Sequence, residues 1–465
     1  MMMSKGTRPE TDSIGTLEVP MDAYYGVQSE RAARNFQITG QHMNPNFIRS
    51  LAMIKKSAAI VNARAGLLSD EKRDAICQAA DEVIAGKWNS SFIVDSIQGG
   101  AGTSANMNMN EVLANRANEL LGGGLGTYDH VHPNDDVNMA QSTNDTIPTA
   151  GKMTVLYLTD VLDGELKRLE KELAKKSVEF QDVLKMGRTQ LQDAVPMTLG
   201  ESFGGYASMI HRCRTRLTTT ARSEMSKISL GATAIGSGIN ASAYYRTHIA
   251  EELSEIAGRP FTIADDLFDA TENLDGFSAV SGALKACALS LSKMCNDLRL
   301  LSSGPRCGLN EINLPPRQNG SSIMPGKVNP VIPEVVTQAA FLVAGHDTTI
   351  TMAAEAGQLE LNAFEPVTFH CLFESFTALT GAVRTLTDNC VKGITANADR
   401  CLTLEQNSVG IATALCPYIG YVKSAKVAKE ALRTGQSVRD VVLAHHLMSP
   451  AKLSEVLDAK RAVSA

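Results

Sequence analysis

An apolar seam near the middle of the chain constrains the fold more than any other feature of the sequence. The seam advances in alternating steps of four and three residues, a period of about 3.5 that is typical of a helix packed almost parallel to its neighbours. Its positions are Val280, Leu284, Cys287, Leu291, Met294, Leu298 and Leu301. The flanking positions carry small residues and few charges, so we predict a long helix that is buried on more than one side.

A second long stretch, from Lys152 to Leu184, repeats this pattern and carries charges on one face. Its apolar positions are Leu158, Leu162, Leu166, Leu169, Leu173 and Phe180. Residues 209–227 and 335–344 add further helical spacing. Long helices that pack nearly parallel to one another form bundles. The sequence therefore predicts a mainly α protein with an unusually long central bundle.

The distribution of glycine, proline and apolar residues predicts three domains. Residues 1–140 mix short helical patterns with glycine-rich turns, and we expect a mixed helical N-terminal domain there. Residues 141–396 hold the long-helix bundle. Residues 397–465 carry short amphipathic patterns separated by glycine and proline, which predicts a small helical C-terminal domain.

Composition excludes several classes of function. The 465 residues include 44 basic and 50 acidic side chains, a net charge of −6, and the pI is near 5.9, which does not fit a nucleic-acid-binding protein. No run approaches the roughly 18 apolar residues of a membrane span. Residues Met1 to Asp12 are polar and lack the apolar core of a signal peptide. We expect no nucleic-acid partner, no membrane anchor and a loose polar leader.

The nine cysteines are scattered, odd in number and free of CxxC spacing. This pattern favours free thiols in the cytoplasm over a disulfide framework. No cysteine lies in ligand spacing with the pairs His130/His132 or His445/His446, so we expect no bound metal. Charged residues make up 20% of the chain, below the usual value of about 25%, which indicates that subunit contacts cover part of the surface.

Three polar, small-residue segments interrupt the helical patterns: Gln98–Glu111, Gln141–Asp145 and Gly320–Pro330. In the third, Asn329 followed by proline is typical of an N-cap and first helical residue, and Lys327 adds a positive charge. Exposed backbone N–H groups at a helix start bind anions. These segments predict a ligand with carboxylates or phosphate, and an ordinary polar connection between helices is the alternative for each. No P-loop or dinucleotide-binding motif occurs.

A fourth polar segment, Gly187–Asp193, follows the helix that we expect to end near Leu184. It is a further candidate for ligand binding. A helix terminus with capping groups is the simpler alternative for this segment alone.

The loop GSSIMPGKVNP at 320–330 carries the signature of the aspartase/fumarase superfamily, which the chain resembles from about Gly15 to about Ser437. The segments QGGAGTSANMN at 98–108, MGRTQLQDAVPMTLG at 186–200 and AAEAGQLELNAFEPV at 353–367 resemble the aspartase branch. Fumarases place a histidine where this chain has Gln190. In contrast, HPNDDVN at 132–138 resembles many fumarases, in which it is associated with a secondary dicarboxylate site.

The resemblance implies a three-domain fold in which five long helices per chain assemble into a tetrameric, twenty-helix core. Each active site of this homotetramer would be shared by three subunits. The implied reaction is the reversible anti elimination of ammonia from L-aspartate to give fumarate, through an aci-carboxylate and without cofactor or metal. A fumarate hydratase, another substituted-succinate lyase and a non-catalytic assembly that binds carboxylates are the alternatives.

The resemblance also implies a role for each candidate site residue. Ser321 would be the base that removes the Cβ proton. The donors to the β-carboxylate would be Thr103, Ser142, Thr143 and Ser322. The α-carboxylate would be held by Lys327 and Asn329. The amino group would be oriented by Asn144 and Thr189, with Gln190 supporting that end.

Elementary chemistry fits these residue types. Removing the Cβ proton adds charge to a group that is already a carboxylate, so the site needs donors that bind more strongly as charge grows. Hydroxyls, amides and a lysine can bind a dianion without repulsion. The departing ammonium already carries its proton, which makes Gln190 sensible where a fumarase uses histidine. The sequence leaves open the partner of Glu334, any activation by divalent cations and the identity of a general acid.

Overall fold

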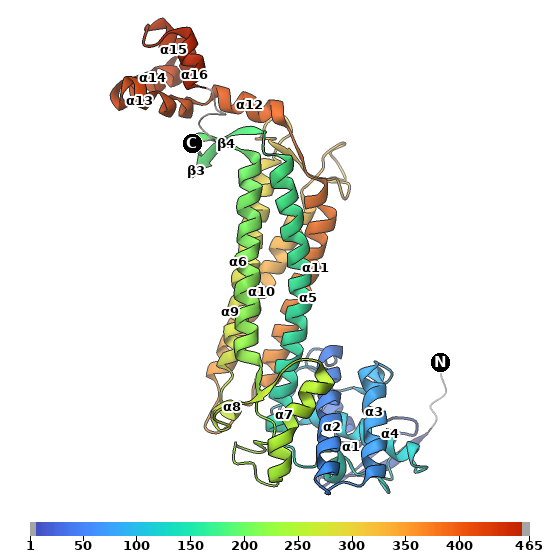
Figure 1. The fold of residues 1–465 in the computed structure, drawn as a ribbon. Helices are drawn as coiled ribbons and strands as arrows, with labels where there is room; N and C mark the ends of the chain where they lie inside the picture. Colours follow the sequence, from blue (N-terminus) through green and yellow to red (C-terminus); the bar gives the residue numbers. More distant parts are fainter. Residues whose placement is uncertain (1–5, 458–465) are drawn as a thin grey trace. The chain divides into compact units, whose positions relative to one another are not determined.

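Residues 6–457, which the computed structural model describes, form a mainly helical protein (Figure 1). This confirms the predicted mainly α class. The long helices are α5 (Thr143–Glu179), α6 (Leu199–Met225), α9 (Asp275–Leu301), α10 (Val331–Glu355) and α11 (Glu365–Asn389). The strands in residues 6–457 form small two-stranded sheets, each away from the bundle seams.

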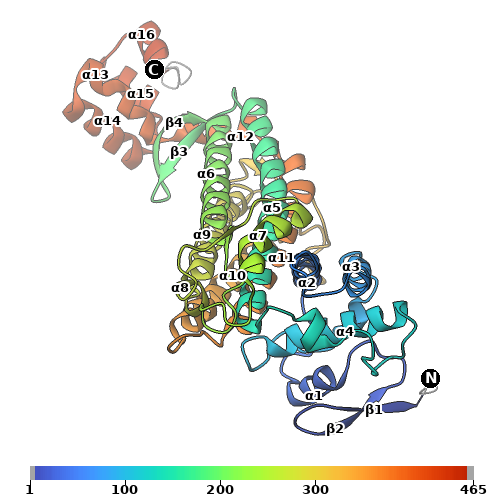
Figure 2. The same cartoon turned by 60° about the horizontal axis from the view of Figure 1, so that its bottom comes forward.

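Two compact units make up the chain, and each long helix contributes a part to both. The first unit comprises Met1–Asp163, Thr215–Ala286 and Phe341–Leu379. The second comprises Gly164–Arg214, Cys287–Ala340 and Thr380–Ala465. Within each unit the parts of the long helices lie side by side (Figure 1, Figure 2). The predicted domain boundaries at residues 140 and 396 stay a prediction.

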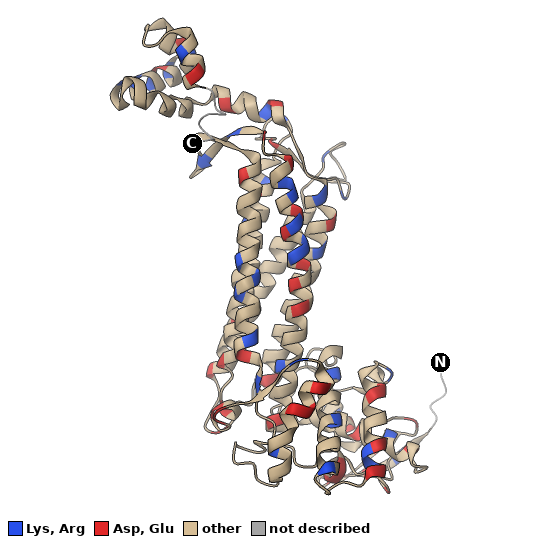
Figure 3. Cartoon of the chain, in the orientation of Figure 1, with Lys and Arg blue, Asp and Glu red and all other residues tan. Residues whose placement is uncertain are grey.

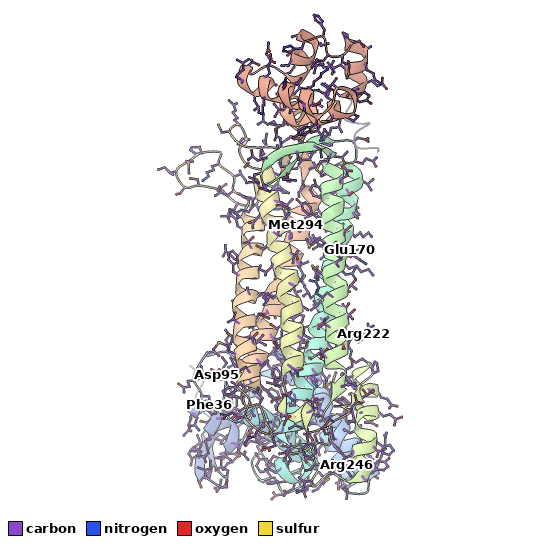
Figure 4. All side chains as sticks on the ribbon, turned by 90° about the vertical axis from the view of Figure 1, so that its left-hand side faces the viewer. Phe36, Asp95, Glu170, Arg222, Arg246 and Met294 are labelled. Carbon is purple, nitrogen blue, oxygen red and sulfur yellow. The ribbon has the colours of Figure 1, made fainter. Side chains whose placement is uncertain are left out.

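The two predicted seams are buried. Side chains with no exposed surface are Leu284, Cys287, Leu291, Met294 and Leu298 on α9, and Leu162, Leu166, Leu169 and Leu173 on α5. Burying one such leucine stabilises the fold by roughly 1.5–3 kcal/mol, so the seams are a large part of what holds the helices together. Polar contacts border them in the second unit, where Glu170 of α5 pairs with Arg214 of α6 (2.7 Å); Figure 4 labels Glu170 and Met294.

A β-hairpin opens the described chain. Strand β1 (Thr7–Thr11) pairs antiparallel with β2 (Thr16–Pro20). The buried guanidinium of Arg8 donates to the Glu10 carboxylate and to backbone carbonyls of residues 20, 21, 23 and 25. The predicted loose leader is therefore wrong for residues 7–11, because contacts with residues further along the chain fix a segment whose own composition is polar. The rest of the predicted leader, residues 1–5, lies outside the described residues.

Six further α-helices within residues 6–457 belong to the first unit. They are α1 (Val27–Asn35), α2 (Pro45–Arg64), α3 (Asp70–Ile84), α4 (Thr103–Leu120), α7 (Ala243–Ala257) and α8 (Asp269–Glu272). Helix α2, at 20 residues, is longer than the short helices predicted here, and it packs against both α3 and α7. The Ser69 hydroxyl caps α3 and the Ser242 hydroxyl caps α7, as serines commonly do at helix starts.

A second hairpin, β3 (Leu184–Thr189) with β4 (Gln192–Thr198), lies in the second unit. The preceding helix α5 ends at Glu179, not near Leu184, and the segment 187–193 is the tip of this hairpin rather than a capped helix terminus. That alternative is therefore wrong. Two further short pairs complete the sheets: β5 (Lys227–Ile228) runs parallel to β6 (Thr262–Ile263), and β7 (Ile312–Asn313) antiparallel to β8 (Thr395–Ala396).

Short helices follow α11, as the sequence predicts for residues 397–465. They are α12 (Ala398–Asn407), α13 (Cys416–Ile419), α14 (Tyr421–Thr434), α15 (Val438–Ala444) and α16 (Pro450–Val456). Their apolar faces form a core of their own around Leu415, Val441 and Leu453, and Met186 of the β3–β4 hairpin joins it.

Charged side chains of both signs share the surface, and the cysteines are thiols rather than disulfides. Basic and acidic side chains are interspersed along α5 and over α2 and α3 (Figure 3). All nine cysteines are free thiols, as the scattered spacing predicts. Among residues 6–457, no helix combines the length and the apolar character that crossing a bilayer requires.

Candidate active site

The glycine run before α4 leads directly into the start of that helix. Gly102 precedes the helix with φ +88°, a left-handed conformation, and a Cβ there would lie 2.8 Å from Ile147. Glycine is therefore required at this position. Thr103, the first helical residue, is exposed, and its hydroxyl donates to the Gly100 carbonyl (2.7 Å). The N–H groups of Thr103 and Ala105 already donate to the Gly100 carbonyl (2.9 Å) and the Gln98 side chain (2.8 Å), so the positive end of the helix dipole, rather than a set of free N–H groups, favours a carboxylate here.

The segment 142–144 lies beside that helix start in the first unit. The Asn106 amide on α4 reaches the Thr143 hydroxyl at 3.5 Å, the limit of a hydrogen bond. The Ser142 hydroxyl accepts from the Asn144 backbone N–H (3.2 Å), and the Asn144 side-chain amide donates to the carbonyl of Ala234 (2.7 Å). The first unit thus brings together the predicted site residues Thr103, Ser142, Thr143 and Asn144.

The other predicted site residues belong to the second unit, and two of them form the tip of the β3–β4 hairpin. Thr189 pairs with Gln192, so Gln190 and Leu191 are the two central turn residues, with φ +55° and +63°. Two left-handed residues are typical of a type I′ turn, which usually contains asparagine and glycine. Holding larger residues there costs about 1–3 kcal/mol each, a cost that is commonly found at functional sites.

A fully buried carboxylate anchors this hairpin. Glu311 accepts from the Arg188 guanidinium (2.7 Å) and lies 3.1 Å from the Lys185 ammonium, and both cations are largely buried. The Glu311 backbone carbonyl accepts from Asn397 (2.9 Å), ahead of α12. One residue therefore ties the strand that carries Thr189 to two other segments of the second unit. The sequence contains no pattern that singles out Glu311.

We expect Glu311→Gln to lower the free energy of unfolding by about 3 kcal/mol, because it leaves two buried cations without a counter-charge. The loss would be measured as a shift in the midpoint of urea unfolding. Glu165→Gln is the matched control, since Glu165 also lies between two arginines, Arg168 and Arg384, which are about half exposed. That control should cost less than about 1 kcal/mol. Equal losses in the two variants would contradict the anchoring role.

The loop 320–330 is closed by its own backbone. The Gly320 N–H donates to the Lys327 carbonyl (3.0 Å), and the Asn329 side-chain amide donates to the Gly320 carbonyl (2.7 Å). A Cβ on Gly320 would lie 2.2 Å from the Lys327 oxygen, which excludes any other residue there. The closed loop therefore leaves Ser322 and Lys327 exposed, while the Asn329 side chain turns inward to the Gly320 carbonyl.

The Ser321 hydroxyl accepts hydrogen bonds from two backbone N–H groups of its own loop. The donors are the N–H groups of Ile323 (3.2 Å) and Met324 (2.9 Å). Hydrogen bonds to an oxygen favour its charged form, so these donors favour the serine oxyanion.

The expected capping role of Asn329 is wrong. Helix α10 begins at Val331, and the carbonyl of Pro330 accepts its first helical bond, from Glu334 (3.2 Å). The Asn329 amide closes the loop instead. Glu334 lies 3.9 Å from the Arg299 guanidinium, which gives a partner to a residue whose partner the sequence left open.

The segment 132–138 forms a short π-helical turn (Pro133–Val137) in the first unit. Its last residue, Asn138, accepts hydrogen bonds from the Lys55 ammonium (2.9 Å) and from the amides of Asn106 (3.1 Å) and Asn110 (3.2 Å). This end of the segment is therefore part of the buried polar layer behind the 142–144 segment.

The predicted site residues of each unit share one chemical character. They offer hydroxyls, amides and backbone N–H groups, and the second unit adds the ammonium of Lys327; groups of these kinds bind and stabilise carboxylates. Within residues 6–457 no three histidine, cysteine, aspartate or glutamate side chains are arranged to hold a metal ion.

Comparison with known families shows what class of protein this fold and these loops define. The family model described as "Lyase" matches residues 15–345, and the model described as "Fumarase C C-terminus" matches residues 411–463. The chain is thus a lyase. The chain belongs to the fumarate lyase, or aspartase/fumarase, superfamily.

Curated relatives match the chain over nearly its whole length. An aspartate ammonia-lyase from a Bacillus species is 51% identical over 98% of this chain and 97% of its own length. The aspartate ammonia-lyase of Pseudomonas aeruginosa is 51% identical over 97% of this chain and 96% of its own length.

Solved structures confirm the fold. A Brucella melitensis protein, described as a fumarate lyase:delta crystallin bound to cobalt, superposes with a TM-score of 0.95 at 47% identity and covers 98% of this chain and 99% of its own. A class II fumarase from Schistosoma mansoni superposes with a TM-score of 0.94 at 35% identity and covers 97% and 98%.

Proposed function

We propose that this protein is an aspartate ammonia-lyase that converts L-aspartate to fumarate and ammonium by reversible anti elimination. The observation that carries this proposal is 51% identity, over almost the entire chain, to enzymes with that activity. The predicted site residues, whose roles follow from the resemblance of their motifs, account for the chemistry as follows.

Ser321 is the proposed base. A serine hydroxyl is a weak base unless its deprotonated form is stabilised, and the two backbone N–H groups at 2.9 and 3.2 Å provide that stabilisation. The Lys327 ammonium on the same closed loop adds a positive charge. In this scheme the Ser321 oxygen takes the Cβ proton, and the electron pair moves into the β-carboxylate to form the aci-carboxylate.

The hydroxyl groups of four residues are the proposed donors to the β-carboxylate: Thr103, Ser142, Thr143 and Ser322. In this scheme the Thr103 hydroxyl exchanges its bond to the Gly100 carbonyl for one to the substrate. The N-terminus of α4 supports these donors, because the positive end of the helix dipole also favours negative charge. These donors bind the intermediate, with two negative charges on this group, more strongly than they bind the substrate. That difference is what lowers the barrier.

The α-carboxylate and the amino group lie at the other end of the proposed site. Lys327 and Asn329 hold the carboxylate, and Asn144 and Thr189 orient the ammonium, with Gln190 supporting that end. The strained hairpin tip favours a role for Gln190, because the turn holds it in a left-handed conformation that larger residues seldom adopt. No strong acid is needed at Gln190, because the substrate's amino group is already protonated and leaves as neutral ammonia, taking the electron pair of the C–N bond.

The proposed assembly is a cytoplasmic homotetramer in which three subunits share each active site and the long helices form a twenty-helix core. Large apolar side chains exposed on the helices of a single chain support it. They are Leu289 and Leu300 on α9 and Val335, Phe341, Leu342 and Met352 on α10. Apolar surface of this kind is typical of subunit interfaces. The nine free cysteines support a cytoplasmic location, because thiols stay reduced in that compartment.

Turnover of purified full-length protein tests the function directly. We expect L-aspartate to yield fumarate, followed by its ultraviolet absorbance, and fumarate with ammonium to yield L-aspartate in the reverse direction. L-Malate should not be turned over at a comparable rate. Turnover of malate alone would contradict the proposal and favour a fumarate hydratase, and turnover of neither would favour a carboxylate-binding assembly.

A further inference from the structure

A fully buried carboxylate lies directly behind the 142–144 segment. Asp145 exposes none of its surface, and one of its oxygens accepts from the backbone N–H of Ser142 (2.9 Å). Its other oxygen accepts from the backbone N–H groups of Gly231 (3.1 Å) and Thr233 (3.0 Å). One side chain thus joins two segments that are far apart in the sequence.

The second of these segments, residues 231–234, is a strained turn. Thr233 has φ +58°, a left-handed conformation that is a genuine outlier for a β-branched residue. The backbone N–H of Thr233 donates to the Asp145 carboxylate, so this hydrogen bond helps hold Thr233 in its left-handed conformation. Strain that the surroundings impose in this way is concentrated at functional sites.

A further contact joins the turn to a predicted site residue. The Asn144 side-chain amide donates to the carbonyl of Ala234, the residue after the strained threonine (2.7 Å). The Asn144 side-chain oxygen is the acceptor of this amide, and the bond to Ala234 determines which way that oxygen faces for a substrate ammonium. The direction in which Asn144 points therefore depends on where the 231–234 turn is held.

The charge of Asp145 is balanced within the same buried layer. Lys55 of α2 is fully buried, donates to Asn138 (2.9 Å) and faces Asp145, whose negative charge partly offsets the effect of burial on the lysine. Burial lowers the pKa of Lys55 to about 7 and raises the pKa of Asp145 to about 7. Tyr245 of α7, also fully buried, is the other titratable group that faces this carboxylate.

We propose that Asp145 is a positioning residue that locks the 231–234 turn to the 142–144 segment, and that this turn is thereby part of the substrate site. The inference rests on the proposed function, since it assigns to Asn144 the orientation of the substrate's ammonium. Asp145 itself touches no substrate. It acts by fixing the backbone of Ser142 and the side-chain direction of Asn144.

Asp145→Asn tests the inference in the full-length enzyme. Asparagine keeps the shape but has one acceptor and one donor group, so it can accept from Ser142 or from the 231–234 turn, but not from both. We expect kcat to fall about 100-fold, because small misplacements of orienting groups cost about that much. The Michaelis constant for L-aspartate should rise less, since every proposed carboxylate ligand other than Ser142 remains in place.

Glu111→Gln is the matched control. Glu111 on α4 is also fully buried, and its carboxylate accepts from the backbone N–H groups of Gly26 (2.9 Å), Gln28 (2.8 Å) and Ser29 (3.1 Å). Burial raises its pKa to about 7 as well, but it holds a segment without predicted site residues. Both variants should lower the unfolding temperature, whereas only Asp145→Asn should lower kcat. Equal kcat values in the two variants and the wild type would overturn the proposal.

A double-mutant cycle with Asn144→Ala provides a measurement that a purely structural role would not change. If Asp145 acts through Asn144, the two substitutions together reduce kcat less than the product of their separate effects. If the kcat of the double variant instead falls by the product of the two separate effects, Asp145 does not act through Asn144. Failure of the wild type to turn over L-aspartate would instead refute the proposed function, so the two failures are distinguishable.

Thr233→Gly decides the question if Asp145→Asn does not fold. Glycine keeps the N–H that Asp145 accepts and is unstrained at a left-handed φ, so the fold should be retained. The turn gains conformational freedom, and we expect kcat to fall roughly fivefold because Asn144 is held less firmly. A wild-type kcat in this variant would show that the turn is not part of the site.

Discussion

Replacing Ser321 by alanine should lower kcat for L-aspartate by about 1,000–10,000-fold, because the substitution removes the group that takes the Cβ proton. The affinity for succinate, an unreactive dicarboxylate, should change by less than about threefold, since the lost oxygen acts on the proton and not on the carboxylates. The rate of fumarate formation and the inhibition constant of succinate measure the two quantities.

Ser303→Ala is the matched control for this prediction. Ser303 is also a loop serine of the second unit, and its hydroxyl also accepts from a backbone N–H, that of Leu309 (3.1 Å). It lies outside the predicted site, so kcat should stay within about twofold of the wild type. The kcat of Ser322→Ala should lie between the values of Ser321→Ala and Ser303→Ala. Losing one donor to the charge that grows on the β-carboxylate typically costs about 100–1,000-fold in rate. A wild-type rate in Ser321→Ala would remove Ser321 from the role of base.

The helical frame of this protein was predictable because its pattern is local. A period of about 3.5 residues over several turns determines which side chains of a helix are buried, and Leu291 and Leu298 of α9 are buried as that period requires. The β1–β2 hairpin was not predictable in this way. It depends on the guanidinium of Arg8, which binds carbonyls 12 to 17 residues away, and the local composition gives no indication of that.

The loops of the site were predictable in place but not in detail. Glycine and serine runs marked the start of α4 and the loop 320–330, since few residues other than glycine fit those backbones. The role of Asn329 could not be predicted, because the same side chain can cap a helix or close a loop, and only the position of the Gly320 carbonyl decides between them. The hairpin that has Gln190 at its tip was missed for a related reason: glutamine and leucine are not the residues that a type I′ turn favours.

The buried carboxylates behind the site were not predictable at all. Asp145 is a single aspartate in a polar segment, and Glu311 is a single glutamate before a short strand. What makes each important is the set of groups that the fold brings to it: backbone N–H groups from residues 231 and 233 for the first, and two cations from β3 for the second. Such convergence depends on tertiary structure, which sequence spacing does not show.

Replacing Lys327 by alanine should lower kcat/KM for L-aspartate by about 1,000-fold, mainly through the Michaelis constant. The ammonium is the one cationic side chain proposed to hold the α-carboxylate, and truncating one partner of a desolvated charge pair typically costs about 2–5 kcal/mol. A 1,000-fold loss corresponds to about 4 kcal/mol. The loop itself should stay closed, because it uses the backbone carbonyl of Lys327 and not the side chain.

Lys392→Ala is the control that separates a local contact from a change in overall charge. It removes the same charge from the second unit at an exposed position, where Lys392 pairs with Asp388 on the last turn of α11, and it should leave both constants within about twofold of the wild type. Lys327→Arg should restore only part of the lost affinity, because guanidinium and ammonium differ in size and geometry. If Lys327→Ala instead keeps the Michaelis constant of the wild type, the α-carboxylate is held elsewhere, and the proposed orientation of the substrate between the two carboxylate sites is wrong.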